Sequence, residues 1–427
     1  MGLIRLQVVC PYCDARLLLN DCPIVATNYE VPAGSFSAGK DQPVPRPVSG
    51  REPHGVLAGR PVLWRPAPPR PAPQKAAPSL MQELRDIVTG TGVEEDYDRY
   101  EREHPVSDYA VYEDLPARAC KQCGEPLPDE IGSRRVFTIG VVGTTGAGKT
   151  HFIAALIEDG FHRQRLRDWG VEEFVPDENS AERFRASYQS FFTERKALGA
   201  TNPSAETDVR LRPMIIKARF RGGPPVLLLI HDIAGETLMY QRSRARYAPF
   251  LSRASGLIFL IDPLMIEPIR SRLPGEFDIG RHVNQADLVN ACLADLRRQQ
   301  RDPHRVPVAI AMSKSDLIEE ALPGVDVGFR RPPSADRRLA EQEMARIDGE
   351  VRNLLRWANA NDLLAVAAQL GHEVPLSFHA VAPIGYTPRE VPGRPDDRVV
   401  ESIASLRCLD PLIAVLRNLR IAPPEPR

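Results

Sequence analysis

The sequence carries almost no net charge, because 55 basic residues face 56 acidic ones and leave a formal charge of −1. No overall field would attract nucleic acid or an anionic membrane, so either partner would need a local patch. Apolar runs are also short, and none in the 427 residues approaches the length that spans a bilayer. The first residues, MGLIRLQVVCPYC, lack the long apolar core and cleavage site of a signal peptide. We therefore expect a cytoplasmic protein with no clear nucleic-acid or membrane signature.

Proline divides the chain into parts of different texture. The stretch PVLWRPAPPRPAPQKAAP at 61–78 resists helix and sheet and offers no pattern that could build a core. We expect residues 29–112 to be a Pro-rich, largely disordered insertion or linker. After residue 133, apolar strand patterns alternate with helical ones. This alternation favours an α/β domain over residues 133–422, with a mostly parallel, doubly wound sheet.

Strand and helix patterns can be placed within this domain. Strands are expected at 134–143, 210–220, 224–233, 256–263, 306–316 and 376–385. Helices are expected at 149–160, 179–199, 285–300 and 341–360. Only the three residues RGG separate the second strand from the third. These two strands are therefore predicted to form an antiparallel hairpin that interrupts the parallel alternation.

A glycine-rich stretch, GTTGAGKT, follows the first strand and matches the pattern G-x-x-x-x-G-K-[ST]. Small residues let successive backbone N–H groups surround phosphate oxygens, and the N-terminus of the next helix adds a partial positive charge. Lys149 would lie along the β and γ phosphates, and the Thr150 hydroxyl would bind Mg²⁺. The predicted phosphate-binding residues are Gly143, Thr144, Thr145, Gly146, Ala147, Gly148, Lys149, Thr150 and His151.

A D-x-x-G pattern ends the third strand, in LLLIHDIAGE. The Asp232 carboxylate can hold Mg²⁺ through a water, and the backbone N–H of Gly235 can reach a γ phosphate. The preceding antiparallel hairpin makes this pattern more specific, because adjacent strands leading into D-x-x-G are typical of Ras-like GTPases.

A base-reading pattern, SKSD, ends the strand at 306–316 and resembles [NT]-K-x-D. The Asp316 carboxylate would accept two hydrogen bonds from guanine, and the aliphatic stem of Lys314 would cover the ring. Adenine would leave that carboxylate unpaired, at roughly 1 to 3 kcal/mol. Ser313 stands where Asn or Thr is usual. On the last strand, Ala382 and Pro383 stand where similar GTPases place a short turn whose backbone contacts the guanine carbonyl. Pro383 has no N–H, so Ala382 or Ile384 would be the donor.

With these motifs in order, residues 134 to about 420 resemble the TRAFAC-class P-loop GTPases. The whole chain resembles bacterial double-GTPase or TRAFAC-associated GTPase-like proteins, which carry a cysteine-rich ribbon ahead of the phosphate loop. VVCPYC, ACKQCGEPLPDE, IGVVGTTGAGKTHFIAALI and IHDIAGE carry this likeness. The resemblance implies a Ras-like fold, GTP or GDP with Mg²⁺, and a role in bacterial regulatory or conflict systems.

Two departures from active GTPases concern turnover. Glu236 follows Gly235 where many GTPases use Gln to orient the attacking water, so hydrolysis is expected to be slow or partner-dependent, with Lys149 and Glu236 as catalytic candidates. The switch threonine that would complete the Mg²⁺ site is either Thr201 or Thr207, and Thr201 is preferred.

Two C-x-x-C pairs lie more than a hundred residues apart. Four thiolates at this spacing suit tetrahedral Zn²⁺, and a long insertion between the pairs adds little loop-closure entropy. We expect residues 1–28 and 113–132 to form a split ribbon around a structural zinc, with free thiols or a redox pair as alternatives. The predicted ligands are Cys10, Cys13, Cys120 and Cys123.

These motifs predict a GTP-binding regulatory protein that acts through protein partners and hydrolyses GTP slowly or only with a partner. One alternative is a non-catalytic scaffold that binds nucleotide. The other is an ATP-dependent P-loop NTPase, which requires Asp316 to be incidental.

Overall fold

The computed structural model describes residues 7–12, 14–19, 22, 24–25, 29–32, 46–47, 62–63, 109–110, 117–118, 120–122, 127–128, 130–195, 198, 212–239, 249–273, 284–299, 306–322, 333–334, 336–369, 374–386, 389–391, 394–399 and 403–421. The chain divides into two compact units. The first holds residues 1–10 and 15–129, and the second holds residues 11–14 and 130–427.

In the first unit, the described residues form short strands. The pair β1 (Gln7–Val9) and β2 (Arg16–Leu18) is antiparallel. Two three-stranded sheets have the strand orders β6-β3-β8 and β5-β4-β7. Their strands are β3 (Ile24–Val25), β4 (Tyr29–Pro32), β5 (Arg46–Pro47), β6 (Val62–Leu63), β7 (Tyr109–Ala110) and β8 (Ala117–Arg118). Four of these strands fall within 29–112, most of which lies outside the described residues, so the linker assignment stays a prediction.

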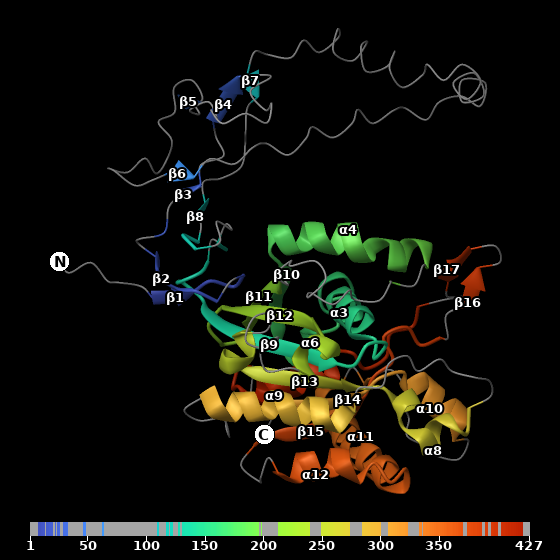
Figure 1. Ribbon diagram of the computed structural model, residues 1–427. Coiled ribbons are helices and arrows are strands. Elements are labelled where there is room, and N and C mark those ends of the chain that lie inside the picture. The colour runs from blue at the N-terminus through green and yellow to red at the C-terminus, as the bar shows by residue number, and fades with distance from the viewer. Residues whose placement is uncertain are drawn as a thin grey trace, which may run out of the picture. The chain divides into compact units, whose positions relative to one another are not determined.

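The second unit is built on a seven-stranded sheet with the order β10-β11-β12-β9-β13-β14-β15 (Figure 1). The strands are β9 (Arg135–Gly143), β10 (Val171–Pro176), β11 (Met214–Phe220), β12 (Val226–Ala234), β13 (Gly256–Ile261), β14 (Val308–Met312) and β15 (Leu376–Ala380). From β12 to β15 every pairing is parallel. The predicted hairpin is confirmed, because β11 pairs antiparallel with β12 and Met214 faces Ile230. The α/β fold class is confirmed with it.

The edge strand β10 was not predicted from the sequence. It pairs antiparallel with β11, and Glu173 forms an ion pair with Arg134 at 3.0 Å between Oε2 and Nη1. Two glutamates in VEEFVP reduce its apolar signal, since strand patterns are recognised by alternating apolar residues. Pairing with β11 stabilises this segment as a strand.

Helices cover both faces of the sheet (Figure 1). They are α3 (Lys149–Ile157), α4 (Glu178–Glu194), α6 (Gly235–Met239), α8 (Glu267–Arg270), α9 (Gln285–Gln299), α10 (Ser315–Ala321), α11 (Arg337–Trp357), α12 (Asn361–Gln369) and α13 (Asp410–Asn418). A π-helical turn at Glu158–His162 continues α3. A hairpin of β16 (Arg389–Val391) and β17 (Arg394–Val399) precedes α13.

Alternate strand residues feed two separate cores, as the two-residue period of a strand requires. Ile258 and Leu260 pack into a core with α3 and α13, whereas Phe259 and Ile261 pack into another with α9 and α12. Residues buried on both faces explain the nearly continuous apolar runs of β13 and β14. The sheet therefore lies between two packed cores beneath the loops at its carboxyl edge.

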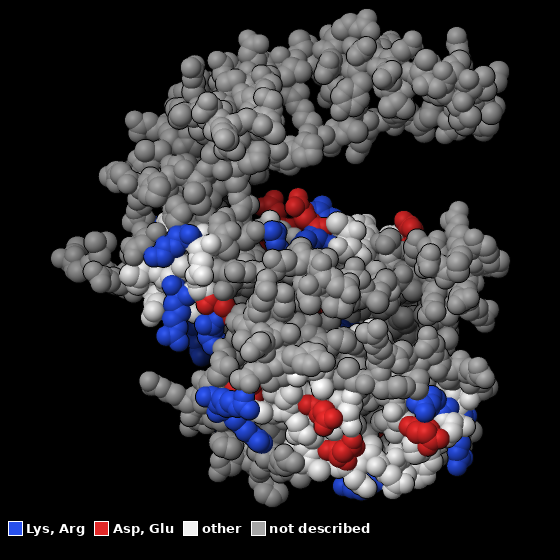
Figure 2. Space-filling model, viewed as in Figure 1, with Lys and Arg blue, Asp and Glu red and all other residues white. Residues whose placement is uncertain are grey.

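The described surface carries charges of both signs, and both basic (blue) and acidic (red) residues occur on the face seen in Figure 2. This distribution agrees with the near-zero net charge of the chain. No described helix is both long enough and apolar enough to cross a membrane.

Candidate functional site

The glycine-rich loop lies between β9 and α3, where the sequence places it. Gly146 and Gly148 adopt left-handed backbone conformations, with φ of 81° and 84°, and Gly148 is the N-cap of α3. Any other residue would strain the backbone at both positions because of this conformation. Steric contact is not the cause, since no atom would lie within 4 Å of an added Cβ. These glycines thus turn the loop into the start of a helix without placing side chains in its concave face.

Lys149 is almost fully buried at the start of α3, at 4% exposure. Its Nζ donates to the backbone carbonyl of Thr144 at 2.9 Å, so the ammonium lies against the first residues of the glycine-rich loop. The Thr144 hydroxyl is also buried, and its oxygen has no hydrogen-bond partner among the described residues. A buried cation beside an unpaired hydroxyl favours an anionic ligand at this position.

Thr150 and Asp232 meet next to this loop. Parallel pairing of β12 with β9 sets Asp232 beside Val141 and Ala234 beside Gly143. The Thr150 hydroxyl donates to Asp232 Oδ2 at 3.0 Å. Asp232 Oδ1 is buried and has no hydrogen-bond partner in the described part of the chain. Burial raises the pKa of Asp232, although the Lys149 charge and the Thr150 hydroxyl oppose that rise.

Gly235 is required by a close approach between two loops. A Cβ on this residue would lie 2.6 Å from the Gly143 carbonyl oxygen and 3.0 Å from Thr144 Cα. The D-x-x-G turn is therefore seated directly against the phosphate loop. Glu236 follows in α6, but its side chain is outside the described residues, as are Thr201 and Thr207. Their catalytic and metal roles stay predictions.

The SKSD loop follows β14 and lies between the ends of the two strands that flank β14, which are β13 and β15. Ser313 donates from both its hydroxyl and its backbone N–H to the Ile261 carbonyl, at 3.1 and 2.8 Å. On the other side, the Ser315 N–H donates to the Val381 carbonyl at 3.1 Å. Lys314 adopts a left-handed conformation at the N-cap of α10, and Asp316 is in the first turn. Ser313 thus braces the loop although it replaces Asn or Thr.

The ammonium of Lys314 is held by an acidic residue that the sequence did not single out. Lys314 Nζ donates to Asp262 Oδ2 at 2.7 Å. The Gln285 side chain in turn forms two hydrogen bonds with the Asp262 backbone. An acidic residue at the carboxyl end of a parallel strand was the available signal for Asp262. Gln285 gave no signal, because only the tertiary fold brings it close.

Ala382 is placed beside the SKSD loop, but its backbone is already engaged. Its N–H donates to the Leu406 carbonyl at 3.1 Å, and the Leu406 N–H donates back at 2.9 Å. A contact from the Ala382 N–H to guanine would require this bridge to open. Ile384, the alternative donor, accepts at its carbonyl from the Ala404 N–H at 2.9 Å.

His151 connects the start of α3 to the segment that follows α4. Its Nε2 accepts from the Leu198 N–H at 3.0 Å, and its ring meets the Phe191 ring at a centroid distance of 5.0 Å. Burial, assisted by the Lys314 charge, lowers the pKa of His151 to about 4, so the imidazole is a neutral acceptor near pH 7. Because the side chain is occupied, residue 151 would contact phosphate through its backbone N–H.

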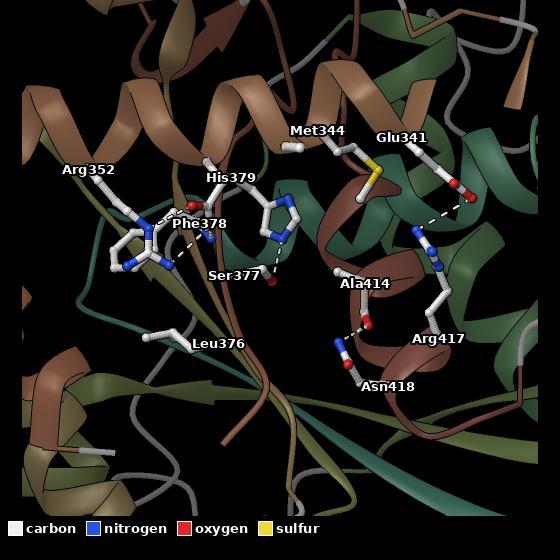
Figure 3. Close-up of a pocket in the computed structure, with 12 residues that line it drawn as sticks. Glu341, Met344, Arg352, Leu376, Ser377, Phe378, His379, Ala414, Arg417 and Asn418 are labelled. Carbon is white, nitrogen blue, oxygen red and sulfur yellow. Dashed lines mark hydrogen bonds and ion pairs between the residues drawn. The ribbon is translucent and has the colours of Figure 1, made fainter. Parts of the chain in front are cut away.

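A cavity of about 840 Å³ lies elsewhere, among α11, β15 and α13. Figure 3 shows Arg352 stacked over Phe378 and Arg417 directed toward Glu341. Arg352 is paired with Asp348 at 2.6 Å between Nε and Oδ2, and Arg417 with Glu341 at 3.4 Å. The charges of this cavity are thus neutralised locally. None of its lining residues belongs to the predicted nucleotide site.

The cysteine pairs are described only in part. Cys10 and Cys120 are both fully buried, and the Gln122 N–H donates to Cys120 Sγ at 3.4 Å. Cys13 and Cys123 lie outside the described residues. No group of three or more His, Cys, Asp or Glu side chains suited to a metal occurs among the residues that the structure describes. The zinc ribbon stays a prediction.

Comparison with known proteins adds two findings. The model of the family described as Double-GTPase 2 matches residues 137–373. The chain is also similar to "Putative ESX-1 scaffolding and assembly protein SaeC" of Mycolicibacterium smegmatis, with 22% identity over 314 residues, which cover 69% of this chain and 77% of SaeC. The family match begins in β9 and extends past the SKSD loop, so it contains most of the site described above.

Proposed function

The chain belongs to the Double-GTPase 2 family, and on that premise we propose that it is a GTP-binding regulatory protein with slow or partner-dependent hydrolysis. The nucleotide is held between the glycine-rich loop at one end and the SKSD loop at the other. All the described residues of this site lie in the second unit, and they are carried by loops at the carboxyl edge of the sheet. This edge is where open parallel sheets bind ligands.

One observation carries the proposal: Lys149, Thr150 and Asp232 converge beside the glycine loop, where two buried oxygen atoms have no hydrogen-bond partner among the described residues. Thr144 Oγ1 and Asp232 Oδ1 are buried without hydrogen-bond partners in the described residues. Unpaired buried oxygens next to a buried lysine are destabilising in the isolated chain. A bound phosphate would accept hydrogen bonds from Lys149 and from the Thr144 hydroxyl. The metal cation that accompanies it would interact with the Asp232 carboxylate.

The same residues fit Mg²⁺. A hydroxyl and a carboxylate with a free oxygen are hard oxygen ligands, which Mg²⁺ combines with phosphate oxygens. Thr150 and Asp232 would hold the ion, with Thr201 as the third predicted ligand. When bound, Mg²⁺ would neutralise charge that develops on the phosphates. Lys149 would do the same from the protein side.

Guanine selectivity is assigned to Asp316, with Ser313 bracing the loop. The test is equilibrium titration with GDP, GTP and ATP. Wild-type protein is expected to bind guanine nucleotides at least about tenfold more tightly than ATP, because adenine leaves the carboxylate unpaired. Asp316→Asn should shift the preference toward xanthine nucleotide. Equal binding of ATP and GTP would instead support the ATP-dependent NTPase.

A nucleotide-binding scaffold is the second candidate, and the similarity to SaeC favours it. SaeC is described as a scaffolding and assembly protein, and such a role needs protein partners rather than turnover. Single-turnover hydrolysis separates the two candidates, measured with and without cell extract and with Glu236→Gln for comparison. Turnover above background with a partner supports the regulatory GTPase. No turnover under any condition, with GTP still bound, supports the scaffold.

A further inference from the structure

Asp262, supported by Gln285, holds the side chain of Lys314 in the base-reading loop, and these two residues are called the acidic clamp. Asp262 follows the last residue of β13, and its Oδ2 accepts from Lys314 Nζ at 2.7 Å. The Asp262 side chain is 6% exposed and the Lys314 side chain 29% exposed, so this ion pair is shielded on its acidic side. Asp262 Oδ1 accepts from the Leu264 N–H at 3.0 Å, which fixes the carboxylate plane.

Gln285, the first residue of α9, holds the backbone of Asp262. Its Oε1 accepts from the Asp262 N–H at 2.6 Å, and its Nε2 donates to the Asp262 carbonyl at 3.1 Å. This two-bond pairing imitates a β ladder at the point where β13 ends. Gln285 is itself buried, at 7% exposure. The result is a continuous connection from α9 through Asp262 to Lys314.

The clamp matters because lysine is flexible. A free lysine loses much rotamer entropy when its stem is ordered against a ligand. Anchoring the ammonium before the ligand arrives removes part of that loss, which is the general benefit of preorganisation. Ser313 fixes the loop backbone on Ile261, but it does not fix the Lys314 side chain. Asp262 supplies that constraint.

We propose that Asp262 is a positioning residue for guanine recognition, that it acts through Lys314, and that Gln285 supports it. This inference rests on the proposed function, since it assumes that Lys314 covers a bound guanine. It assigns part of the base affinity to residues just after β13 and at the start of α9, outside the SKSD motif. The contrasting interpretation is an ion pair that only stabilises the fold.

A double-mutant cycle on GDP affinity separates these interpretations. Asp262→Asn keeps the shape and the acceptor for Leu264 but removes the negative charge that faces Lys314. We expect Asp262→Asn and Lys314→Ala each to weaken GDP binding about tenfold or more. The double variant should bind no more weakly than Lys314→Ala, because the clamp has nothing left to position. An equal loss from Asp262→Asn in both backgrounds would overturn the proposal.

Two controls make the outcome readable. Asp295→Asn neutralises a different buried carboxylate, which lies on α9 and pairs with Arg298 at 3.3 Å, and it should leave GDP affinity unchanged. If Asp262→Asn fails to fold, Gln285→Ala tests the same clamp, and we expect it to weaken GDP binding several-fold. If the wild-type chain binds no GDP, the proposed function itself fails. If it binds GDP and neither clamp variant alters affinity, only the clamp is refuted.

Discussion

The phosphate end and the base end of the candidate site are built in different ways. At the phosphate end, one contiguous loop and one adjacent strand supply Lys149, Thr150 and Asp232, and glycines permit the close backbone approach. At the base end, the SKSD loop depends on the ends of β13 and β15 and on α9. The structure of the phosphate end is determined mainly by backbone geometry. The structure of the base end is determined mainly by tertiary contacts of side chains. Substitutions should therefore affect the two ends unequally.

The largest effect is expected from Gly235→Ala, which tests the close approach at the phosphate end. Its Cβ would lie 2.6 Å from a backbone oxygen, and backbone cannot yield as a flexible side chain can. Overpacking of about 2 kcal/mol would weaken Mg²⁺·GTP binding by about 30-fold. Isothermal titration or a fluorescent nucleotide would measure the change.

Gly349→Ala is the matched control for that variant. Gly349 lies within α11, and no atom would lie within 4 Å of a Cβ added at this position. This substitution should leave affinity unchanged and raise the free energy of unfolding by roughly 0.5 to 1 kcal/mol, from helix propensity alone. Equal affinities for both variants would show that the loops do not need their observed contact.

A smaller effect is expected at the base end from Ser313→Ala. The variant loses the hydroxyl bond to the Ile261 carbonyl at 3.1 Å, but the backbone N–H still satisfies that carbonyl at 2.8 Å. One neutral hydrogen bond contributes about 1 kcal/mol, so GDP affinity should fall about fivefold. Ser377→Ala removes a comparable hydroxyl bond in the cavity beside β15 and should leave GDP affinity unchanged. A matching loss in both variants would point to general destabilisation.

His151→Ala should act on the neighbouring segment more than on the nucleotide. The Leu198 N–H would lose its acceptor, so hydrogen exchange of a peptide containing Leu198 should quicken about fivefold. GDP affinity should change by less than about threefold, since the imidazole already has a protein partner. His162→Ala, an exposed histidine on the π-helical turn, serves as the control. If the peptide containing Leu198 exchanged as slowly in His151→Ala as in the wild-type protein, this role of His151 would be contradicted.

The same contrast explains what the sequence predicted. The glycine loop and D-x-x-G were recognised because their chemistry is contiguous in sequence. The strand positions followed from apolar runs, and the hairpin of β11 and β12 followed from the short RGG connection. Asp262 and Gln285 act together across 23 positions and share no local pattern. Strand β10 was missed because its stability comes from pairing with β11. Features set by short-range geometry were thus predictable, and those set by tertiary contacts were not.

The smallest effect on nucleotide affinity is expected from removal of the proposed zinc. Cys10 and Cys120 belong to the first unit, whereas the described residues of the nucleotide site belong to the second. The Gln122 N–H to Cys120 Sγ bond suits a thiolate, which accepts hydrogen bonds more strongly than a thiol. Metal analysis should find about one zinc per chain, as a Cys₄ site requires. Removal of zinc by a chelator, with Mg²⁺ kept in excess during the measurement, should leave GDP affinity within about twofold of its starting value, because the loss of zinc removes no group of the nucleotide site.

Two cysteine variants sharpen that last test. Cys120→Ser should lose the zinc, since serine does not replace a thiolate ligand. Cys22→Ser alters another buried thiol of the first unit, one that donates to the Leu18 carbonyl at 3.6 Å, and it should keep the metal. Zinc that survives Cys120→Ser would refute the predicted ligand set. A tenfold fall in GDP affinity on chelation would instead show that the cysteine region supports the nucleotide site, and the two units would then have to be treated as coupled.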